Sequence, residues 1–378
     1  TVVVMDFPSL TELKARNTLK WTRYGDDVLP LWVAESDFST CPEVKAAIMD
    51  AVQRESFGYP PDGHGLAPAL AAFSTTRYGW EINPARVFPV PDVVRGVYLA
   101  LSFLTKPESP TIIPAPAYMP FWELTAATGR ETMVIDAYGG LDLNDIEDCF
   151  KRGAGSLILC NPYNPLGYTF SREFLIELAD LTARYDARII SDEIHGPLVY
   201  DGTHIPAASV SDTAAQACVT VTATSKAWNI AGLKCAQMIF TNDEDVARWN
   251  AVPWMLRDGV SILGLVAAQA CYEAPTSFLD DQVAQLKANR DFLVEELPKR
   301  APGVLTANPE ATYLMWLDFR NTPLADQPAA QLMRQAKIAL NEGTTFGQGG
   351  EGHARLNFAC SPDTLEIAID RIASAVAG

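Results

Sequence analysis

The sequence predicts an α/β protein, with a buried, mostly parallel sheet covered by helices on both faces and a smaller α+β domain. Two observations lead to this prediction. In the middle of the chain, short continuous apolar runs alternate with helical patterns, as parallel strands joined by right-handed crossovers do. After about residue 278 the pattern changes to one long amphipathic helix and a few short strands. The 378 residues are enough for two to three domains of roughly 150 residues.

Five apolar runs predict the strands of the large sheet. They are Thr111–Pro116, Ser156–Pro162, Ala187–Glu193, Cys218–Lys226 and Ala236–Asn242. Ser171 is the expected N-cap of the helix that follows the second run. Apolar residues recur on one face of that helix, at Phe174, Leu175, Leu178, Leu181 and Tyr185. Because ligands of open α/β sheets bind beyond the carboxyl ends of the strands, the polar residues after these runs are the candidate site.

The smaller domain is predicted from the C-terminal hundred residues. Apolar positions between Val283 and Leu297 indicate a long helix that we expect Pro298 to end. Thr312–Phe319 alternates like a half-exposed strand, Ala354–Cys360 is another short strand, and a closing helix begins near Pro362. The first 40 residues lack a strand pattern, and we expect them to wrap onto this domain. The predicted boundaries are therefore 40–278 for the large domain and 1–39 with 279–378 for the small one.

The composition excludes several classes of function. Asp and Glu number 46 against 29 Lys and Arg, a net charge of −17, which disfavours binding to nucleic acid and to anionic membranes. No apolar run of about 18 residues predicts a membrane span, and the first ten residues do not resemble a signal peptide. The seven cysteines form no CxxC pair, and the four histidines show no metal-ligand spacing. We therefore expect a cytoplasmic protein with reduced thiols and no metal.

Three predicted strand ends carry polar residues that suit one cofactor. Asn164 lies in CNPYNPLG, Asp192 in SDEIHGPL and Lys226 in TATSKAWNIAGLK. For pyridoxal 5′-phosphate, a lysine amine binds the aldehyde, a buried aspartate keeps the pyridine nitrogen protonated, and an asparagine amide donates to the ring oxygen. Taken singly, each residue also fits a solvated loop lysine, a helix N-cap or a double turn. The three together, each after an apolar run, favour the cofactor site.

Several motifs resemble those of fold-type I pyridoxal-phosphate enzymes, the aspartate aminotransferase superfamily. The resemblance covers essentially the whole chain and is closest to the cystathionine β-lyase, or carbon–sulfur lyase, branch. The matching segments are LPLWVAESDF (Leu29–Phe38), FGYP (Phe57–Pro60), PAYMPF (Pro116–Phe121), NPYNPLG, SDEIH, SKAWNIAGLK and ARLNFAC. This resemblance implies a seven-stranded sheet, pyridoxal phosphate as the cofactor and a place in methionine and cysteine metabolism.

The resemblance also implies roles for residues around the cofactor ring. Lys226 is the catalytic lysine that binds the cofactor, and Asp192 pairs with the pyridine nitrogen. Asn164 bonds the ring oxygen, and Tyr118 stacks on the ring face. Ile194 stands where many aminotransferases have a tyrosine, which favours the lyase branch.

A second group of residues is implied for the cofactor phosphate. The amides of Val93 and Val94 begin a helix whose N-terminus suits an anion. Ser225 is a further donor, with Thr222 or Thr224 as alternatives because Ala223 replaces the usual serine. Lys234 stands where relatives have an arginine, and it supplies the charge without the bidentate fork. Tyr59 would reach the phosphate of the partner subunit, which implies a homodimer.

The remaining implied roles concern a small amino-acid substrate. Arg355 would clamp its α-carboxylate in a bidentate pair. Trp32 and Tyr118 would also contact the substrate, and the segments Trp32–Asp37 and Gly343–His353 would shape the side-chain site. The glycine-rich second segment is either a mobile loop or a plain connector, and His195 either packs or touches the site.

The resemblance therefore predicts β-elimination from a sulfur amino acid such as L-cystathionine, which gives pyruvate and ammonia. The alternative within the same fold is an aminotransferase, which uses the same proton removal but returns the proton to the cofactor. A third possibility is a regulator that binds a protein partner. The residues alone do not separate the first two.

Overall fold

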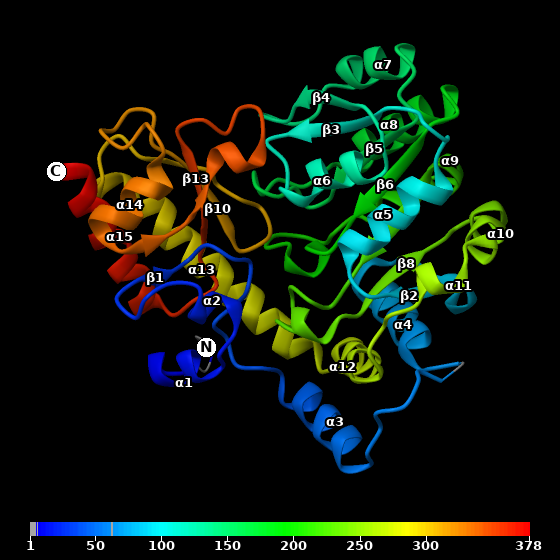
Figure 1. The fold of residues 1–378 in the computed structure, drawn as a ribbon, viewed down its shortest axis with the longest axis horizontal. Coiled ribbons are helices and arrows are strands. Elements are labelled where there is room, and N and C mark those ends of the chain that lie inside the picture. Colours follow the sequence, from blue (N-terminus) through cyan, green and yellow to red (C-terminus); the bar gives the residue numbers. More distant parts are fainter. Residues whose placement is uncertain (1–4, 6, 62) are drawn as a thin grey trace.

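Seven strands form the large sheet of the computed structural model, which describes residues 5, 7–61 and 63–378. Their order is β2-β8-β7-β6-β5-β3-β4 (Figure 1). The strands are β2 (Val87–Val90), β3 (Thr111–Ala115), β4 (Thr132–Asp136), β5 (Ser156–Cys160), β6 (Arg188–Asp192), β7 (Cys218–Thr222) and β8 (Ala236–Ile239). Only β8 in this sheet runs against its neighbours. The mostly parallel sheet predicted from the sequence is thus confirmed.

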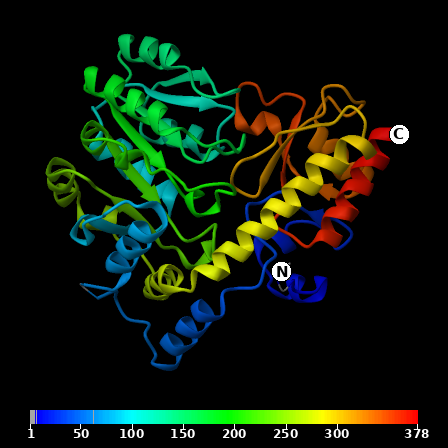
Figure 2. The same ribbon diagram turned by 180° about the vertical axis from the view of Figure 1, so that it is seen from behind.

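Helices cover both faces of this sheet (Figures 1 and 2). On one face of the sheet, α5 packs against β6, β7 and β8 and touches α6. On the other face, α8 contacts both α7 and α9. Further helices border the β2 edge and lead toward the smaller part. The helices are α3 (Pro42–Gln53), α4 (Leu66–Tyr78), α5 (Val93–Leu104), α6 (Pro120–Ala127), α7 (Leu143–Lys151), α8 (Arg172–Arg184), α9 (Asp212–Ala217), α10 (Asp243–Ala251), α11 (Trp254–Arg257) and α12 (Ile262–Glu273).

Local sequence explains these boundaries. The side chain of Ser171 accepts a hydrogen bond from the Phe174 amide at 3.1 Å, so α8 begins where the sequence predicts. The five predicted strands are β3, β5, β6, β7 and β8; β5 and β7 end before Asn164 and Lys226, whereas β6 ends at Asp192 itself. The predicted run Cys218–Lys226, for example, leaves the sheet after Thr222, because residues 224–229 form a turn.

The smaller part combines a four-stranded sheet with three helices. The sheet has the order β12-β13-β10-β9. Its elements are β9 (Leu305–Thr306), β10 (Leu314–Asp318), β12 (Asn341–Glu342), β13 (His353–Asn357), α13 (Thr276–Arg300), α14 (Pro328–Ala336) and α15 (Pro362–Ala377). As predicted, α15 begins at Pro362, where Ser361 caps the Thr364 amide at 3.2 Å.

Two expectations about this part are wrong. Pro298 does not end α13, which continues to Arg300, because the proline lies in the last turn of the helix. The strand predicted to be half exposed is buried from Thr312 to Leu317. Its second face is covered because Trp316 packs against Phe346, with ring centroids 5.1 Å apart.

The N-terminal segment lies against the smaller part. It contains α1 (Leu10–Ala15), α2 (Leu19–Thr22) and β1 (Leu29–Pro30), and β1 pairs in parallel with β11 (Ile338–Ala339). This pairing favours the predicted grouping of 1–39 with 279–378, whose exact boundaries stay a prediction. Residues 1–4 lie outside the described part.

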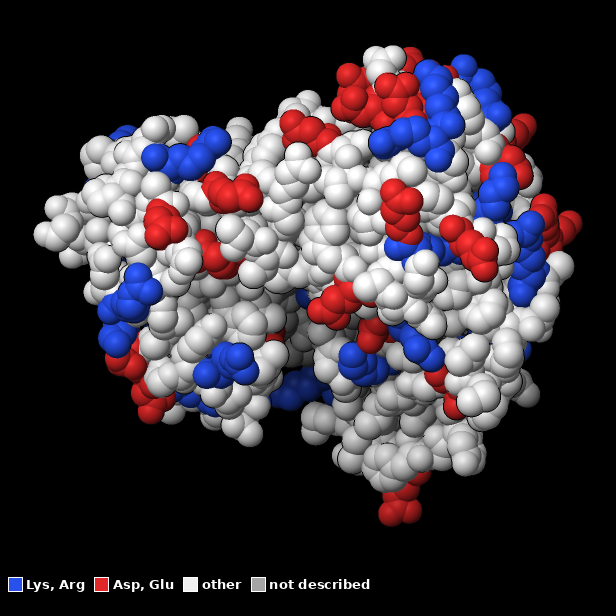
Figure 3. Space-filling view, turned by 45° about the horizontal axis from the view of Figure 1, so that its top comes forward, with Lys and Arg blue, Asp and Glu red and all other residues white. Residues whose placement is uncertain are grey.

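The described surface and interior are consistent with an acidic globular chain. Figure 3 shows basic and acidic side chains mixed over one face, with a hollow between the two parts and basic groups at its floor. Within the described residues no helix is long and apolar enough to span a membrane, and no cluster of metal-ligating side chains is found. All seven cysteines are buried free thiols.

Candidate active site

Three neighbouring parallel strands bring the predicted polar residues to one edge of the large sheet. β5 pairs with β6, and β6 with β7, so that Cys160, Asp192 and Val221 lie side by side. The turn that carries Asn164 and the turn that carries Lys226 therefore leave the sheet on either side of Asp192. The structure thus brings together the three residues that the strand-end argument singled out.

The Lys226 amine lies in an environment that favours its neutral form. Nζ donates a hydrogen bond to the Ala34 carbonyl at 2.9 Å. Burial, and then the nearby charge of Arg355, lower the pKa of Lys226 to about 8. At pH 7 about one molecule in ten then has a neutral amine, against about one in three thousand at the ordinary pKa. An amine of this kind can serve as a nucleophile or a base near neutral pH.

Asp192 is a buried carboxyl that needs a positive partner. Burial raises the pKa of Asp192 to about 7, although the Ile194 amide and Lys226 oppose the rise. The Ile194 amide donates to its Oδ1 at 3.2 Å. A protonated pyridine nitrogen would supply the missing positive charge and keep Asp192 ionised.

Arg355 and Asn164 contact each other directly, which the sequence did not indicate. Arg355, only 2% exposed, donates from Nη1 to the Asn164 Oδ1 at 3.1 Å. From Nη2 it donates to the Trp32 carbonyl at 3.2 Å and to the Asn341 Oδ1 at 2.7 Å. Its guanidinium lies 4.9 Å from the ring centre of Phe346. Because the Asn164 oxygen accepts from Arg355, its NH2 group remains the donor for a ring oxygen.

The candidate phosphate residues meet at the N-terminus of α5. Lys234 Nζ lies 2.9 Å from Asp92 Oδ2, and Asp92 directly precedes Val93 and Val94. A Cβ at Gly96 would come 2.6 Å from Val221 Cγ1, so the glycine allows α5 to lie close against β7. This close approach places the start of α5 beside the strand that leads to Lys226.

Other predicted residues differ in how closely they join this group. Tyr118 is half buried, and burial raises the pKa of its hydroxyl. The charge of Arg355 lowers this pKa and that of Asp192 raises it, both to a smaller extent, so Tyr118 lies near both groups. Trp32 contributes its carbonyl, while its indole Nε1 is buried without a partner. Ser225 lies in the turn before Lys226, and its carbonyl accepts a hydrogen bond from the Ile230 amide at 3.2 Å.

Tyr59 stands apart from the other predicted residues. It is 93% exposed and lines a surface pocket of about 580 Å³ that also includes Trp254 and Arg257. Within one chain it therefore does not join the group around Lys226.

His195 packs in the interior beside the candidate site. Burial, followed by the charges of Lys226 and Arg355, lowers its pKa to about 3, so the ring is neutral. It meets Tyr313 edge to face, with centroids 6.1 Å apart. Its neighbour Glu193 is held by a separate buried network, in which His204 Nε2 lies 2.8 Å from Oε2.

The glycine-rich segment Gly343–His353 is fixed at two points on the large part. The Ala117 amide donates to the Phe346 carbonyl at 2.8 Å, and the Tyr138 hydroxyl donates to the Gly349 carbonyl at 2.7 Å. These bonds hold the Phe346 ring under Arg355 and next to the Tyr118 loop.

Sequence reasoning missed four contributors to this site. Tyr313 donates from its hydroxyl to the Ala34 carbonyl at 3.0 Å, the same oxygen that accepts from Lys226. Asn341 and Phe346 hold Arg355, and Asn229 bonds the backbone of Ser36. Asn229 carried a signal because it lies in the SKAWNIAGLK motif, and Phe346 because it lies in the glycine-rich segment Gly343–His353. Tyr313 and Asn341 lie outside every motif named for the site.

The described side chains suit pyridoxal phosphate. The buried Nε of Arg355 has no hydrogen-bond partner among the described residues. Burial raises the pKa of the Asp192 carboxyl, and a basic ring nitrogen beside it would favour its ionised form. A helix N-terminus and a lysine lie together at the expected phosphate end. The donors and charges therefore match an anionic group with a basic ring nitrogen.

Comparison with known proteins agrees with this geometry. The family model for aminotransferase class I and II matches residues 26–372. Cystathionine β-lyase of Corynebacterium glutamicum is 57% identical over 370 residues, covering 98% of this chain and 100% of that protein.

Two solved structures are also similar along the whole chain. One, from Corynebacterium diphtheriae and assigned as a PLP-dependent β-cystathionase, is 56% identical with a TM-score of 0.98, covering 99% of this chain and 100% of that one. Cystalysin of Treponema denticola, whose crystal structure contains pyridoxal 5′-phosphate, is 26% identical with a TM-score of 0.92 and covers 99% of each chain. The chain therefore belongs to the class I and II aminotransferase family.

Proposed function

We propose that this chain is a pyridoxal-phosphate-dependent carbon–sulfur β-lyase that releases a thiol from L-cystathionine or related cysteine S-conjugates. The remaining part of the substrate yields pyruvate and ammonia. The observation that carries the proposal is the Lys226 amine with its lowered pKa, located between Asp192 and Arg355. The full-length similarity to cystathionine β-lyase supports the choice of reaction.

The proposed reaction assigns a separate role to each side chain of the site. Pyridoxal phosphate, when bound, withdraws electrons from the substrate Cα. Lys226 holds the cofactor aldehyde and, as a free amine, removes the Cα proton. Asp192 keeps the ring nitrogen protonated, Asn164 donates to the ring oxygen, and Tyr118 lies on the ring face. Arg355 fixes the substrate carboxylate, which orients the Cα–H bond toward Lys226.

A substitution at Arg355 tests the carboxylate clamp. Arg355→Lys is expected to lower kcat/KM for L-cystathionine by about 30-fold or more, because lysine keeps the charge but loses the paired donors of a buried contact. The effect should fall mainly on KM. Steady-state kinetics on the purified holoenzyme measures it.

Arg320→Lys is the matched control for this substitution. Arg320 is 63% exposed by side chain and pairs with Asp318 at the surface, so its replacement should leave both kinetic constants within about twofold. Equal kinetics for the Arg355 and Arg320 variants would contradict the clamp.

The reaction type is tested by supplying L-cystathionine to the holoenzyme without any keto acid. We expect sustained formation of pyruvate over many turnovers, because elimination regenerates the enzyme. An aminotransferase would stop after one half-turnover, since its bound cofactor would be converted to the amine form and no keto acid is present to take the amino group back. Pyruvate measured against enzyme concentration separates these outcomes. Comparison of several β-substituted alanines then identifies the preferred leaving group.

We also propose a cytoplasmic homodimer in which Tyr59 reaches the phosphate site of the second subunit. The support is the 93% exposure of Tyr59 on a surface pocket with Trp254, away from its own chain's site. Two exposed apolar neighbours, Phe57 and Met255, favour burial against another copy.

A further inference from the structure

The segment Trp32–Asp37, which we call the strap, is held by side chains rather than by a sheet. Each of its first five backbone carbonyls accepts a hydrogen bond from at least one side chain. The donors are Arg355 to Trp32, Asn357 to Val33 and Glu35, Lys226 and Tyr313 to Ala34, Lys20 to Glu35, and both Asn229 (2.9 Å) and the longer contact from Arg16 (3.5 Å) to Ser36. The strap therefore follows a path that distant residues determine.

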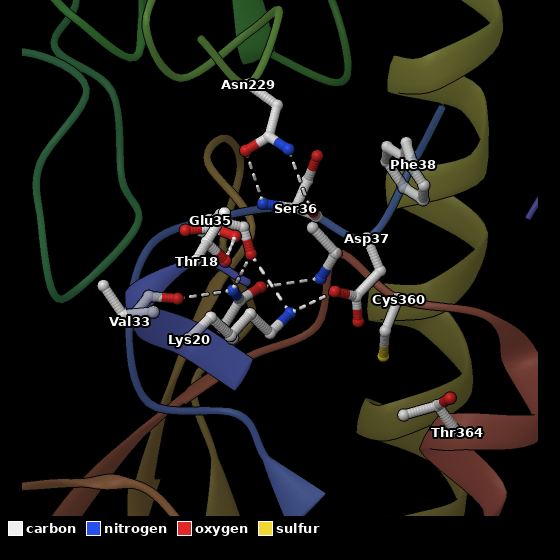
Figure 4. A network of polar contacts seen from close by, with 12 residues as sticks. Thr18, Lys20, Val33, Glu35, Ser36, Asp37, Phe38, Asn229, Cys360 and Thr364 are labelled. Carbon is white, nitrogen blue, oxygen red and sulfur yellow. Dashed lines mark hydrogen bonds and ion pairs between the residues drawn. The ribbon is translucent and has the colours of Figure 1, made fainter. Parts of the chain in front are cut away.

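One end of the strap is fixed to the smaller part. The Asp37 amide donates to the Ala359 carbonyl at 2.8 Å, and the Asp37 carboxylate lies 2.6 Å from Lys20 Nζ (Figure 4). Asn357 Nδ2 donates to two strap carbonyls at 2.7 Å each. These contacts fix the strap but do not reach the turn that carries Lys226.

Asn229 supplies a link from the lysine turn to the strap. Its Oδ1 accepts from the Ser36 amide and its Nδ2 donates to the Ser36 carbonyl, both at 2.9 Å (Figure 4). Asn229 lies three residues after Lys226 in the same turn. Its φ is 55°, in the left-handed region that asparagine tolerates, and Asn17 has a similar φ of 53°. A two-point contact of this kind fixes both the position and the orientation of the Ser36 peptide.

The Ala34 carbonyl, two residues earlier, is the oxygen that the Lys226 amine contacts. Nζ donates to it at 2.9 Å and the Tyr313 hydroxyl at 3.0 Å. Because one oxygen accepts from both groups, its position determines where the free amine points. Asn229 acts on that position through the Ser36 amide, which belongs to the peptide next to the one that carries the Ala34 carbonyl.

We infer that Asn229 is a positioning residue for Lys226, which acts by fixing the strap so that the Ala34 carbonyl orients the free amine. This inference rests on the proposed function, in which that amine removes the Cα proton. Misplacement of a base by about 1 Å can lower a rate by about 10²-fold. Loss of the Asn229 amide should therefore slow proton removal without weakening substrate binding.

The test uses Asn229→Gly in the holoenzyme, because glycine accepts the left-handed backbone and removes only the amide. Asn17→Gly is the matched control, since Asn17 has the same backbone conformation (φ 53°) on an exposed loop. We expect Asn229→Gly to lower kcat about 10- to 100-fold with KM changed less than about threefold. Its cofactor absorbance and thermal midpoint should match those of Asn17→Gly.

The rate of exchange of the substrate Cα hydrogen in D2O is the second readout. Elimination and transamination share this step, so the exchange reports on Asn229 even if the wild-type enzyme makes no pyruvate. Failure of the lyase proposal and failure of this inference are therefore distinguishable. Exchange by Asn229→Gly at the wild-type rate would overturn the inference.

Asn229→Asp is the second variant, for use if the glycine variant does not fold. It keeps the acceptor for the Ser36 amide and is expected to show a smaller loss of kcat.

A double-substitution cycle with Tyr313→Phe tests the route through Ala34. If both residues act on the same carbonyl, the loss of exchange rate in the double variant is smaller than the product of the two single losses. Single losses that multiply, or a Tyr313→Phe variant with an unchanged rate, would contradict this route.

Discussion

Lys226→Ala is expected to lower turnover of L-cystathionine by about 10²- to 10⁴-fold, because the variant lacks the only base proposed for the Cα proton. The purified variant should also lose the absorbance near roughly 420 nm that a lysine-bound cofactor gives. Pyruvate release and an absorbance spectrum measure the two effects. Retained colour together with retained turnover would refute the assignment of Lys226.

Lys45→Ala serves as the control for this substitution. Lys45 is exposed on α3 and makes no contact with the candidate site. Its replacement should leave both readouts at the wild-type level, whereas a comparable loss would point to a general effect of removing a lysine.

The pH dependence of the wild-type enzyme follows from the same assignment. Since burial and Arg355 lower the pKa of Lys226 to about 8, the neutral amine increases as the pH rises toward that value. The rate of Cα exchange should therefore rise about tenfold per pH unit below pH 8 and level off above it. A rate that still climbs steeply to pH 10 would indicate an amine with an ordinary pKa.

Lys20→Met is expected to have the largest effect on stability. Lys20 and Asp37 form an ion pair whose side chains are 0% and 3% exposed, with Nζ and Oδ1 2.6 Å apart. Removal of the lysine leaves a buried carboxylate without its counter-charge, which costs about 3–5 kcal/mol. Burial already raises the pKa of Asp37, and Lys20 is the main influence that opposes the rise. Chemical denaturation followed by circular dichroism measures the loss.

Two further variants separate the charge effect from packing. Lys14→Met removes the lysine of an exposed pair with Asp26, whose side chains are 35% and 94% exposed, so its cost should stay below about 1 kcal/mol. The double variant Lys20→Met/Asp37→Leu replaces both charges by apolar groups and should recover much of the lost stability. Equal costs for Lys20→Met and Lys14→Met would show that the buried pair is not the cause.

The strand ends were predictable because their signals are local. Asn164, Asp192 and Lys226 each follow an apolar run, and parallel strands bring such ends to one edge of a sheet. The direction of β8 was not predictable, because a short buried run such as AQMI looks the same in either direction. The expectation for Pro298 was wrong because proline, although it removes one hydrogen bond to the preceding turn, keeps a helical φ and does not force the two residues after it out of the helix.

The resemblance named the strap segment, but the contacts that hold the strap were not predictable, for a different reason. Its carbonyls bond to side chains as far as 324 residues away in sequence, so no periodic pattern marks them. Tyr313 is a fully buried aromatic residue next to β10, and such residues usually belong to the core. Only the structure shows that its hydroxyl donates to the same carbonyl oxygen as Lys226. Every residue has a backbone carbonyl, so a hydrogen bond to that oxygen does not require a particular residue type. The sequence therefore does not show where such contacts form.

The contacts to backbone carbonyls of the strap separate its main chain, which they hold in place, from its side chains, which they do not involve. Arg355, Asn357 and Lys226 donate to main-chain carbonyls, so these hydrogen bonds do not depend on which side chains stand at positions 33 and 34. A substitution at either position therefore leaves in place the backbone oxygens to which Lys226 and Arg355 donate, and with them the orientation of the amine.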